Sequence, residues 1–156
     1  MNNVILYSTK HGTTEKCAKL LGEKLSGKTT LIDLKGSKEV DLSAYDKVII
    51  GGAVYMGKIQ KEVTSFCKEN SKSLLNKKLG VFICGMSDDI EKELTASYPK
   101  EILEKAEARE CFGGEFIFQN MSFFEKLIIK KIAKTDKNIS KLSEESINRF
   151  VEKMGV

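Results

Sequence analysis

The sequence predicts an α/β fold of the doubly wound type, in which a parallel sheet of five strands carries helices on both faces. Two observations lead to this prediction. Continuous apolar runs recur along the chain, as is typical of parallel strands buried on both sides. Between them lie segments whose apolar residues stand three and four positions apart, which indicates amphipathic helices. Strands that alternate with helices in this way form right-handed βαβ units and a parallel sheet.

The first strand and the first helix are expected at the N-terminus. Val4–Tyr7 is an apolar run bounded by polar residues, which favours a buried strand. From Glu15 onward, small or apolar residues recur on one helix face. They are Cys17, Ala18, Leu21, Gly22 and Leu25. The intervening loop, residues 8–14, therefore ends at a helix N-terminus.

That loop has the chemistry of a phosphate site. A helix N-terminus presents unpaired backbone N–H groups and the positive end of the helix dipole. Hydroxyl donors are added by Ser8, Thr9, Thr13 and Thr14. The alternative is that Thr13 or Thr14 is an ordinary N-cap and that the other hydroxyls are solvated. The loop alone favours neither interpretation.

The β-branched segment Thr29–Asp33 is expected to be the second strand. The residues after it predict a third strand, a helix and a fourth strand. Val48–Gly52 is a third strand that stops at its glycines, and a loop over residues 53–58 follows it. Leu79–Cys84 is a fourth buried strand. Between the third and fourth strands, one helix face is formed by Ile59, Val63, Phe66 and Cys67.

The C-terminal part predicts a broken helix, a strand and a last helix. The broken helix includes Leu94, and Pro99 restarts it at its first turn, before Ile102, Leu103 and Ala106. Cys111–Phe118 is a fifth strand, in which Gly113 and Gly114 indicate a bulge. The last helix is expected over Leu142–Met154, and its buried face comprises Leu142, Ile147, Phe150, Val151 and Met154.

Length and composition predict one globular domain over residues 1–156. Charged residues make up 31% of the chain and apolar ones 41%, an ordinary balance for a folded domain. There is neither an apolar run of membrane-spanning length nor a secretory signal, so we expect a cytoplasmic protein. The net charge of +4 is spread along the chain, which argues against a nucleic-acid partner.

The cysteine and histidine pattern excludes the common metal sites. The four cysteines form no CxxC pair, and three of them fall in apolar patterns where a reduced cysteine acts as a small core residue. His11 is the single histidine, and its loop position is as consistent with no chemistry as with a flavin or phosphate contact. We therefore expect neither a metal nor a disulfide framework.

Ligands of parallel α/β sheets bind at the carboxyl ends of the strands, here in the loops 8–14, 52–57 and 85–89. A literal P-loop pattern over Gly22–Thr29 is rejected, because it ends a helix and enters a strand, the reverse of what phosphate binding needs. The fingerprint GxGxxG is absent from the first turn, which carries only Gly12. A receiver domain is excluded as well, since acidic residues are missing after the first strand and no Asp follows the third.

With these loops the chain resembles the flavodoxin-like superfamily. The resemblance implies the strand order 2-1-3-4-5 and a bound FMN, whose phosphate is held by the first loop and whose ring lies between the other two. Tyr55 would stack on the ring, backbone N–H groups would reach its polar edge, and no general base or other catalytic residue is assigned. The residues expected to bind FMN are Ser8, Thr9, Lys10, His11, Gly12, Thr13, Thr14, Ala53, Val54, Tyr55, Met56, Gly57, Met86, Ser87 and Asp88.

Within that superfamily the chain is most similar to the menaquinone-dependent protoporphyrinogen IX dehydrogenase family. The similarity rests on Ile5–Thr9, Tyr45–Gly51, Tyr55–Gly57 and Phe124–Asp136. It implies that FMN takes reducing equivalents from a porphyrinogen and passes them to a membrane quinone. One departure weakens the substrate assignment: Phe116–Asn120 stand where the family leads us to expect arginines and tyrosines. Cations for the substrate's propionates would then come from elsewhere, for example Lys10, Lys58 or the lysines of the next helix.

The segment Met121–Lys134 resembles the insert that distinguishes this family from simple flavodoxins. Its phenylalanines, leucine and isoleucines interleave with four lysines, the pattern of a basic amphipathic helix. One use of such a helix is peripheral contact with an anionic membrane, where a quinone can be reached. The alternative, which we favour, is a helix packed on the sheet with its lysines in water.

Two functions from different classes remain. The first is an FMN enzyme that passes electrons from a small reduced substrate to a quinone. The second is a flavodoxin-type carrier that docks onto redox partner proteins. Typical carriers are strongly acidic, whereas this chain is basic at +4, which counts against the carrier. A nicotinamide-linked quinone reductase is a weaker third candidate, since the chain has no nicotinamide motif.

Overall fold

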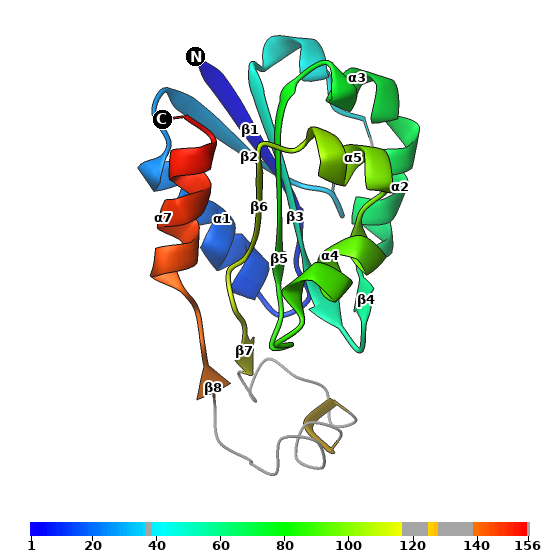
Figure 1. Cartoon of the computed structure of the whole chain (residues 1–156), viewed down its shortest axis with the longest axis vertical. Helices are drawn as coiled ribbons and strands as arrows, with labels where there is room; N and C mark the ends of the chain where they lie inside the picture. Colours follow the sequence, from blue (N-terminus) through cyan, green and yellow to red (C-terminus); the bar gives the residue numbers. More distant parts are fainter. Residues whose placement is uncertain (37–38, 117–124, 128–138, 156) are drawn as a thin grey trace.

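Five parallel strands form the centre of the structure, a computed structural model that describes residues 1–36, 39–116, 125–127 and 139–155. They pair in the order β2-β1-β3-β5-β6, which confirms the predicted order 2-1-3-4-5 (Figure 1). A short sixth strand, β4, pairs with β3 outside this path. The bounds are β1 Asn2–Ser8, β2 Lys28–Asp33, β3 Lys47–Tyr55, β4 Lys58–Ile59, β5 Lys78–Cys84 and β6 Ala108–Cys111.

Helices cover both faces of this sheet (Figure 1). One face carries α1 (Thr13–Lys24) and α7 (Glu144–Lys153). The other carries α2 (Lys61–Glu69), α3 (Ser71–Leu75), α4 (Ile90–Ser97) and α5 (Lys100–Lys105). The apolar side chains divide between two separate cores in the same way, because neighbouring residues of a strand point to opposite faces. The predicted two-sided burial of the strands is therefore confirmed.

The end of β3 differs from its prediction. The strand does not stop at Gly51 and Gly52 but continues to Tyr55, and the chain then turns back into β4. Met56 and Gly57 both have positive φ, 54° and 78°, as a two-residue hairpin turn requires. The predicted loop over residues 53–58 is thus a β-hairpin. Ile59 lies in β4 rather than in the helix, which begins at Lys61.

The fifth strand also has different bounds. β6 ends at Cys111, so the predicted strand Cys111–Phe118 is wrong, and the part beyond Phe116 lies outside the described residues. The two glycines end the strand instead of forming a bulge within it. Gly113 has a φ of +84°, and a Cβ there would lie 1.9 Å from the carbonyl oxygen of Lys141. The chain continues into β7 (Glu115–Phe116), which pairs antiparallel with β8 (Ile139–Ser140).

The helix ends shift by a residue or two from the predicted ones, as local capping dictates. α1 begins at Thr13, before Glu15, and α7 begins at Glu144, where the Ser143 hydroxyl accepts a hydrogen bond from the N–H of Ser146. Pro99 separates α4 from α5, as expected. A short 3-10 helix, η1, covers Leu42–Ala44. Of the segment Met121–Lys134, the structure describes only residues 125–127, which are helical.

Phe82 depends on Gly51 for its place in the core. Its ring stacks on Phe112, with ring centroids 4.6 Å apart, and meets Phe150 edge-on. A Cβ added at Gly51 would lie 2.0 Å from Cζ of Phe82, so the ring would have to leave this cluster. The site at the strand ends is built on that packing.

We therefore expect Gly51→Ala to lower the free energy of unfolding by about 1–3 kcal/mol, because overpacking displaces the Phe82 ring. Urea unfolding followed by circular dichroism measures this. Gly36→Ala is the matched control, since the nearest atom to an added Cβ there is 3.8 Å away, and its effect should stay within about 0.5 kcal/mol. Equal effects of the two substitutions would contradict the packing argument.

Candidate functional site

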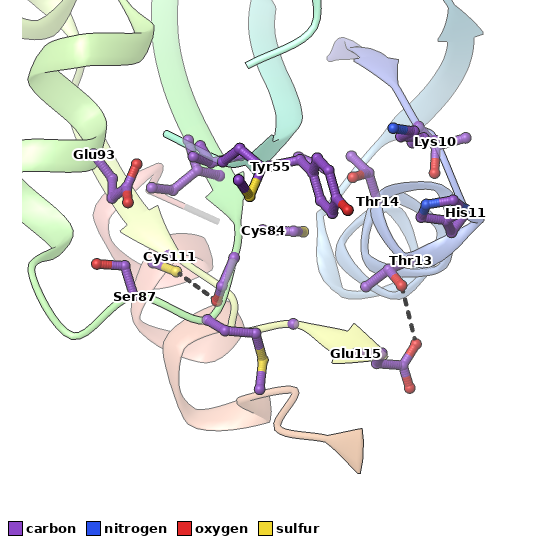
Figure 2. Close-up of a pocket in the computed structure, with 18 of the residues that line it drawn as sticks. Lys10, His11, Thr13, Thr14, Tyr55, Cys84, Ser87, Glu93, Cys111 and Glu115 are labelled. Carbon is purple, nitrogen blue, oxygen red and sulfur yellow. Dashed lines mark hydrogen bonds between the residues drawn. The ribbon is translucent and has the colours of Figure 1, made fainter. Parts of the chain in front are cut away.

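A cavity of about 230 Å³ lies at the carboxyl ends of β1, β3 and β5, where the sequence predicts ligand loops. The β1–α1 loop, the β3–β4 hairpin and the β5–α4 loop all line it (Figure 2). Most of its wall is apolar, with polar groups at its two ends. Of the residues expected to bind a ligand, those that line it are Thr9, Lys10, His11, Thr13, Thr14, Ala53, Val54, Tyr55, Met56, Gly57, Met86 and Ser87.

Three residues of the expected set lie outside the cavity wall. Ser8 is fully buried, and its hydroxyl donates to Glu62 of α2, with 3.1 Å between the oxygens. Asp88 is exposed in the β5–α4 loop. Gly12 stands at the N-cap of α1 and shapes the first loop through its backbone.

The start of α1 leaves its first backbone N–H groups without a side-chain cap. Gly12 is the N-cap, in the left-handed conformation with a φ of 91°, so neither Thr13 nor Thr14 caps the helix. The N–H of Gly12 donates to the hydroxyl of Thr9 at 2.9 Å, which closes the loop. The remaining N–H groups and the helix dipole favour an anion at this end of the cavity.

Thr14 supplies a second, independent sign of a ligand. Its side chain lines the cavity and is fully buried, yet its Oγ1 has no hydrogen-bond partner among the described residues. The hydroxyl lies near Cys84 and acts to lower the pKa of that thiol, but the contact lacks hydrogen-bond geometry. A buried hydroxyl without a partner costs free energy, so a ligand oxygen at this position would offset that cost.

Two carboxylates already face the donors of this loop. Glu115 of β7 accepts from the hydroxyl of Thr13 at 3.3 Å and from Nζ of Lys16 at 3.2 Å. Glu125 lies 2.6 Å from Nε2 of His11, and 3.3 Å from Nζ of Lys10. The loop therefore attracts anionic oxygens, and carboxylates from remote parts of the chain stand where an anionic ligand would approach.

Tyr55 forms the central part of the wall. Nζ of Lys10 lies 4.4 Å from the centre of its ring, a cation–π contact that joins the hairpin to the first loop. Its hydroxyl is buried and has no hydrogen-bond partner in the described part of the chain. Gln60 fixes the hairpin by accepting from the N–H of Ala53 at 2.9 Å. An aromatic face beside an apolar cavity suits a planar ring.

The cavity wall also holds residues that sequence reasoning missed. Ile90 and Glu93 from α4 line it on the side away from the first loop, whereas Gly114 and Glu115, beyond β6, line it elsewhere, with Glu115 beside Thr13. The sequence could have indicated Glu93 as a cavity residue, since it falls at the start of the helix after the fourth strand. It could not have indicated Glu115, because the predicted fifth strand continued through that residue.

Cysteines form the floor. Cys84 and Cys111 line the cavity at the ends of β5 and β6, and Cys17 lies behind Cys84. Two causes raise the pKa of Cys84: contact with the Cys17 thiol is the larger, and burial is the second. Burial also raises the pKa of Cys111. Both therefore stay protonated at neutral pH. The described residues contain no disulfide and no group of three side chains able to hold a metal ion.

Residues 4–143 match the sequence model of a protein family, the flavodoxin domain family. None of the curated proteins compared with the chain matches it. Among solved structures, the chain is similar to a flavodoxin of Streptococcus pneumoniae TIGR4, with a TM-score of 0.53 and 17% identity over 99% of this chain and 95% of that one.

A flavoprotein of Lactobacillus acidophilus NCFM, solved in complex with FMN, matches with a TM-score of 0.51 and 15% identity over 72% of this chain and 91% of that one. The rubredoxin oxygen:oxidoreductase of Desulfovibrio gigas matches with a TM-score of 0.55 and 17% identity over 99% of this chain. The chain spans only 37% of that protein. At these identities the likeness establishes the fold.

Thr14→Val tests the hydroxyl without a partner. We expect the free energy of unfolding to stay unchanged or to rise by up to about 1 kcal/mol, because no hydrogen bond is lost. Binding of inorganic phosphate, measured by calorimetry, should weaken about tenfold. Thr13→Val is the control: its hydroxyl bonds Glu115, so its loss should lower stability. A destabilised Thr14→Val that binds phosphate normally would assign the hydroxyl a purely structural role.

Proposed function

Since the chain belongs to the flavodoxin-domain family of flavin-binding redox proteins, we propose that it is an FMN-dependent oxidoreductase that passes electrons from a porphyrinogen-like substrate to a quinone. FMN is its cofactor, and the chain acts as a single FMN-binding domain. One observation carries this proposal: an uncapped helix start, with a buried Thr14 hydroxyl that has no partner in the described ranges, meets an apolar cavity walled by Tyr55.

The cavity residues fit FMN. Its phosphate would lie at the start of α1, where the uncapped N–H groups and the hydroxyl of Thr14 are available. Its ring would lie between Tyr55 and the loop that carries Met86. When bound, FMN supplies the redox chemistry. The protein orients the ring and shields it from water.

Apolar side chains at the rim favour a small organic substrate. Met56 at the hairpin tip is 65% exposed and Ile90 at the start of α4 is 41% exposed, and both line the cavity. Burying them against an apolar substrate would be favourable. Glu125, one of the described residues of the segment that resembles the family insert, contacts Lys10 and His11 of the first loop. A porphyrinogen and a quinone are both largely apolar, so both suit this rim.

The second candidate is an electron carrier that docks onto a redox partner protein. The exposed rim favours it too, because an apolar patch around a cofactor can bind a protein surface. The net charge of +4 counts against it. Stepwise reduction with a titrated reductant discriminates the two, since a carrier accepts electrons one at a time whereas a dehydrogenase accepts a pair.

Contact with a membrane quinone is part of the proposal. In the described part of the chain, no helix has the length and apolar character needed to cross a membrane. Peripheral contact through Met121–Lys134 is proposed instead, and Leu127 in that segment is 48% exposed. The rest of the segment lies outside the described residues.

The test is to add protoporphyrinogen IX without oxygen to the protein loaded with FMN. We expect protein-dependent bleaching of the flavin together with the appearance of porphyrin fluorescence, at a rate above that with free FMN. Ile90→Lys should slow this reaction, because it places a charge at the apolar rim, whereas Leu20→Lys, at an exposed site on α1 outside the cavity, should not.

Tight FMN binding without any bleaching would contradict the porphyrinogen assignment and favour the carrier. Equal effects of Ile90→Lys and Leu20→Lys would show that the rim does not select the substrate. When the FMN-bound protein is present in a smaller amount than the porphyrinogen, the reaction stops once all flavin is reduced. If adding a quinone then restarts porphyrin formation, the proposed acceptor is supported.

A further inference from the structure

Glu115 is a carboxylate that the fold holds against the start of α1. It stands on β7 and lines the cavity, and its side chain is only 7% exposed. One carboxylate oxygen accepts from the hydroxyl of Thr13 at 3.3 Å, as Figure 2 shows. The other accepts from Nζ of Lys16 at 3.2 Å and from the hydroxyl of Ser140 at 2.9 Å. A carboxylate this buried depends on its partners, so these bonds matter more than those of an exposed ion pair.

Two of these three partners belong to the end of the cavity that suits an anion. Thr13 is the first residue of α1, and Lys16 follows in the same turn. Thr14, whose buried hydroxyl has no partner among the described residues, lies between them in the sequence. This end of the cavity thus already holds one negative charge, supplied by a residue 102 positions away from Thr13.

A carboxylate and a phosphate cannot share these donors. Both are anions, and like charges that bind the same groups repel each other strongly where water is excluded. A phosphate ester carries up to two negative charges and three strong acceptor oxygens, whereas a carboxylate carries one charge and two oxygens. The phosphate is therefore the stronger partner for the helix start, and Glu115 is the group that leaves.

The hairpin that carries Glu115 is short enough to move with it. β7 and β8 pair over two residues each, with Glu115 opposite Ser140. A two-stranded ribbon has only marginal stability of its own. The N–H of Lys141 donates to the carbonyl of Gly114 at 2.8 Å and continues the pairing by one bond. The bonds from Glu115 to Thr13 and Lys16 therefore fasten this hairpin to α1.

We propose that Glu115 is an internal stand-in for a phosphate: it holds the donors of α1 until a phosphate displaces it, which releases the β7–β8 hairpin from α1. The contact is autoinhibitory, since a phosphate ligand has to break it. The inference rests on the proposed function for its natural ligand, FMN, but the contact acts on inorganic phosphate as well. Riboflavin, which lacks the phosphate, gains nothing from displacing Glu115.

The contact makes phosphate binding weaker than the donors alone would allow. Whenever Glu115 holds Thr13 and Lys16, a phosphate finds these donors taken, and its apparent dissociation constant rises in proportion. Removing the charge of Glu115 therefore tightens phosphate binding, although the residue lines the cavity. A residue that merely supports the site would have the opposite effect.

The experiment measures dissociation constants for inorganic phosphate, FMN and riboflavin by calorimetry. Glu115→Gln removes the charge but keeps an oxygen that can accept from Thr13. Glu144→Gln is the matched control, because Glu144 lies 3.1 Å from Nζ of Lys24, at the far end of the same helix. We expect Glu115→Gln to bind phosphate and FMN about tenfold more tightly than the wild type, with unchanged affinity for riboflavin. Glu144→Gln should bind all three as the wild type does.

A second measurement follows the hairpin in the wild type. Amide hydrogen exchange of the Lys141 N–H should become faster when phosphate binds, because its bond to Gly114 opens more often. The Lys28 N–H, which donates to the carbonyl of Met1 at the other end of the sheet, should not exchange faster. Ligand binding by itself stabilises the folded state, so locally faster exchange is specific to displacement.

Unchanged or weaker phosphate binding by Glu115→Gln would overturn the inference, as would an equal gain for riboflavin. Slower exchange of the Lys141 N–H in the phosphate-bound wild type would overturn the displacement. If the wild type binds inorganic phosphate but not FMN, and the variant binds phosphate more tightly, the cofactor assignment fails while the inference stands. FMN binding without porphyrinogen oxidation contradicts only the proposed reaction.

Discussion

The left-handed conformation of Gly12 is the constraint on which the site depends. It turns the chain directly from the end of β1 into α1, so the helix begins without a side-chain cap and its first N–H groups face the strand ends. Because the same turn buries Thr14, its hydroxyl, which has no hydrogen-bond partner among the residues the structure describes, lies beside those groups. The uncapped helix start follows from this backbone angle, and Glu115 and Glu125 contact the residues around it.

The aromatic cluster of Phe82, Phe112 and Phe150 supports the cavity wall formed by the ends of β5 and β6. It fixes β5, the end of β6 and α7 against one another, with Phe112 and Phe150 ring centroids 5.5 Å apart. Beyond it, the N–H of Gly85 donates to the carbonyl of Gly113 at 2.9 Å, which brings the segment after β6 across the β5–α4 loop. Core packing thus positions the end of β5 and the segment after β6, which both line the cavity.

Local signals were sufficient for the buried strands β1 and β5. Val4–Tyr7 and Leu79–Cys84 are continuous apolar runs, and such runs have one stable environment, a sheet buried on both faces. Prediction was less successful where a residue's neighbours come from remote parts of the chain. Gly51 and Gly52 look like the end of a strand, yet β3 continues through them because Phe82 and Ile59 occupy the space that side chains would need.

The sequence alone determined the α/β class, the strand order that the resemblance implied, and the position of the first loop between a buried strand and a helix start, because periodicity and helix starts are properties of neighbouring residues. The tertiary structure decided which residues surround the cavity. It made Gly12 the N-cap in place of a threonine, converted residues 53–58 into a hairpin, placed Glu93 and Glu115 in one cavity wall, and brought Glu125 against His11. No local pattern encodes these contacts, since they arise only when segments as distant as α1 and β7 pack together.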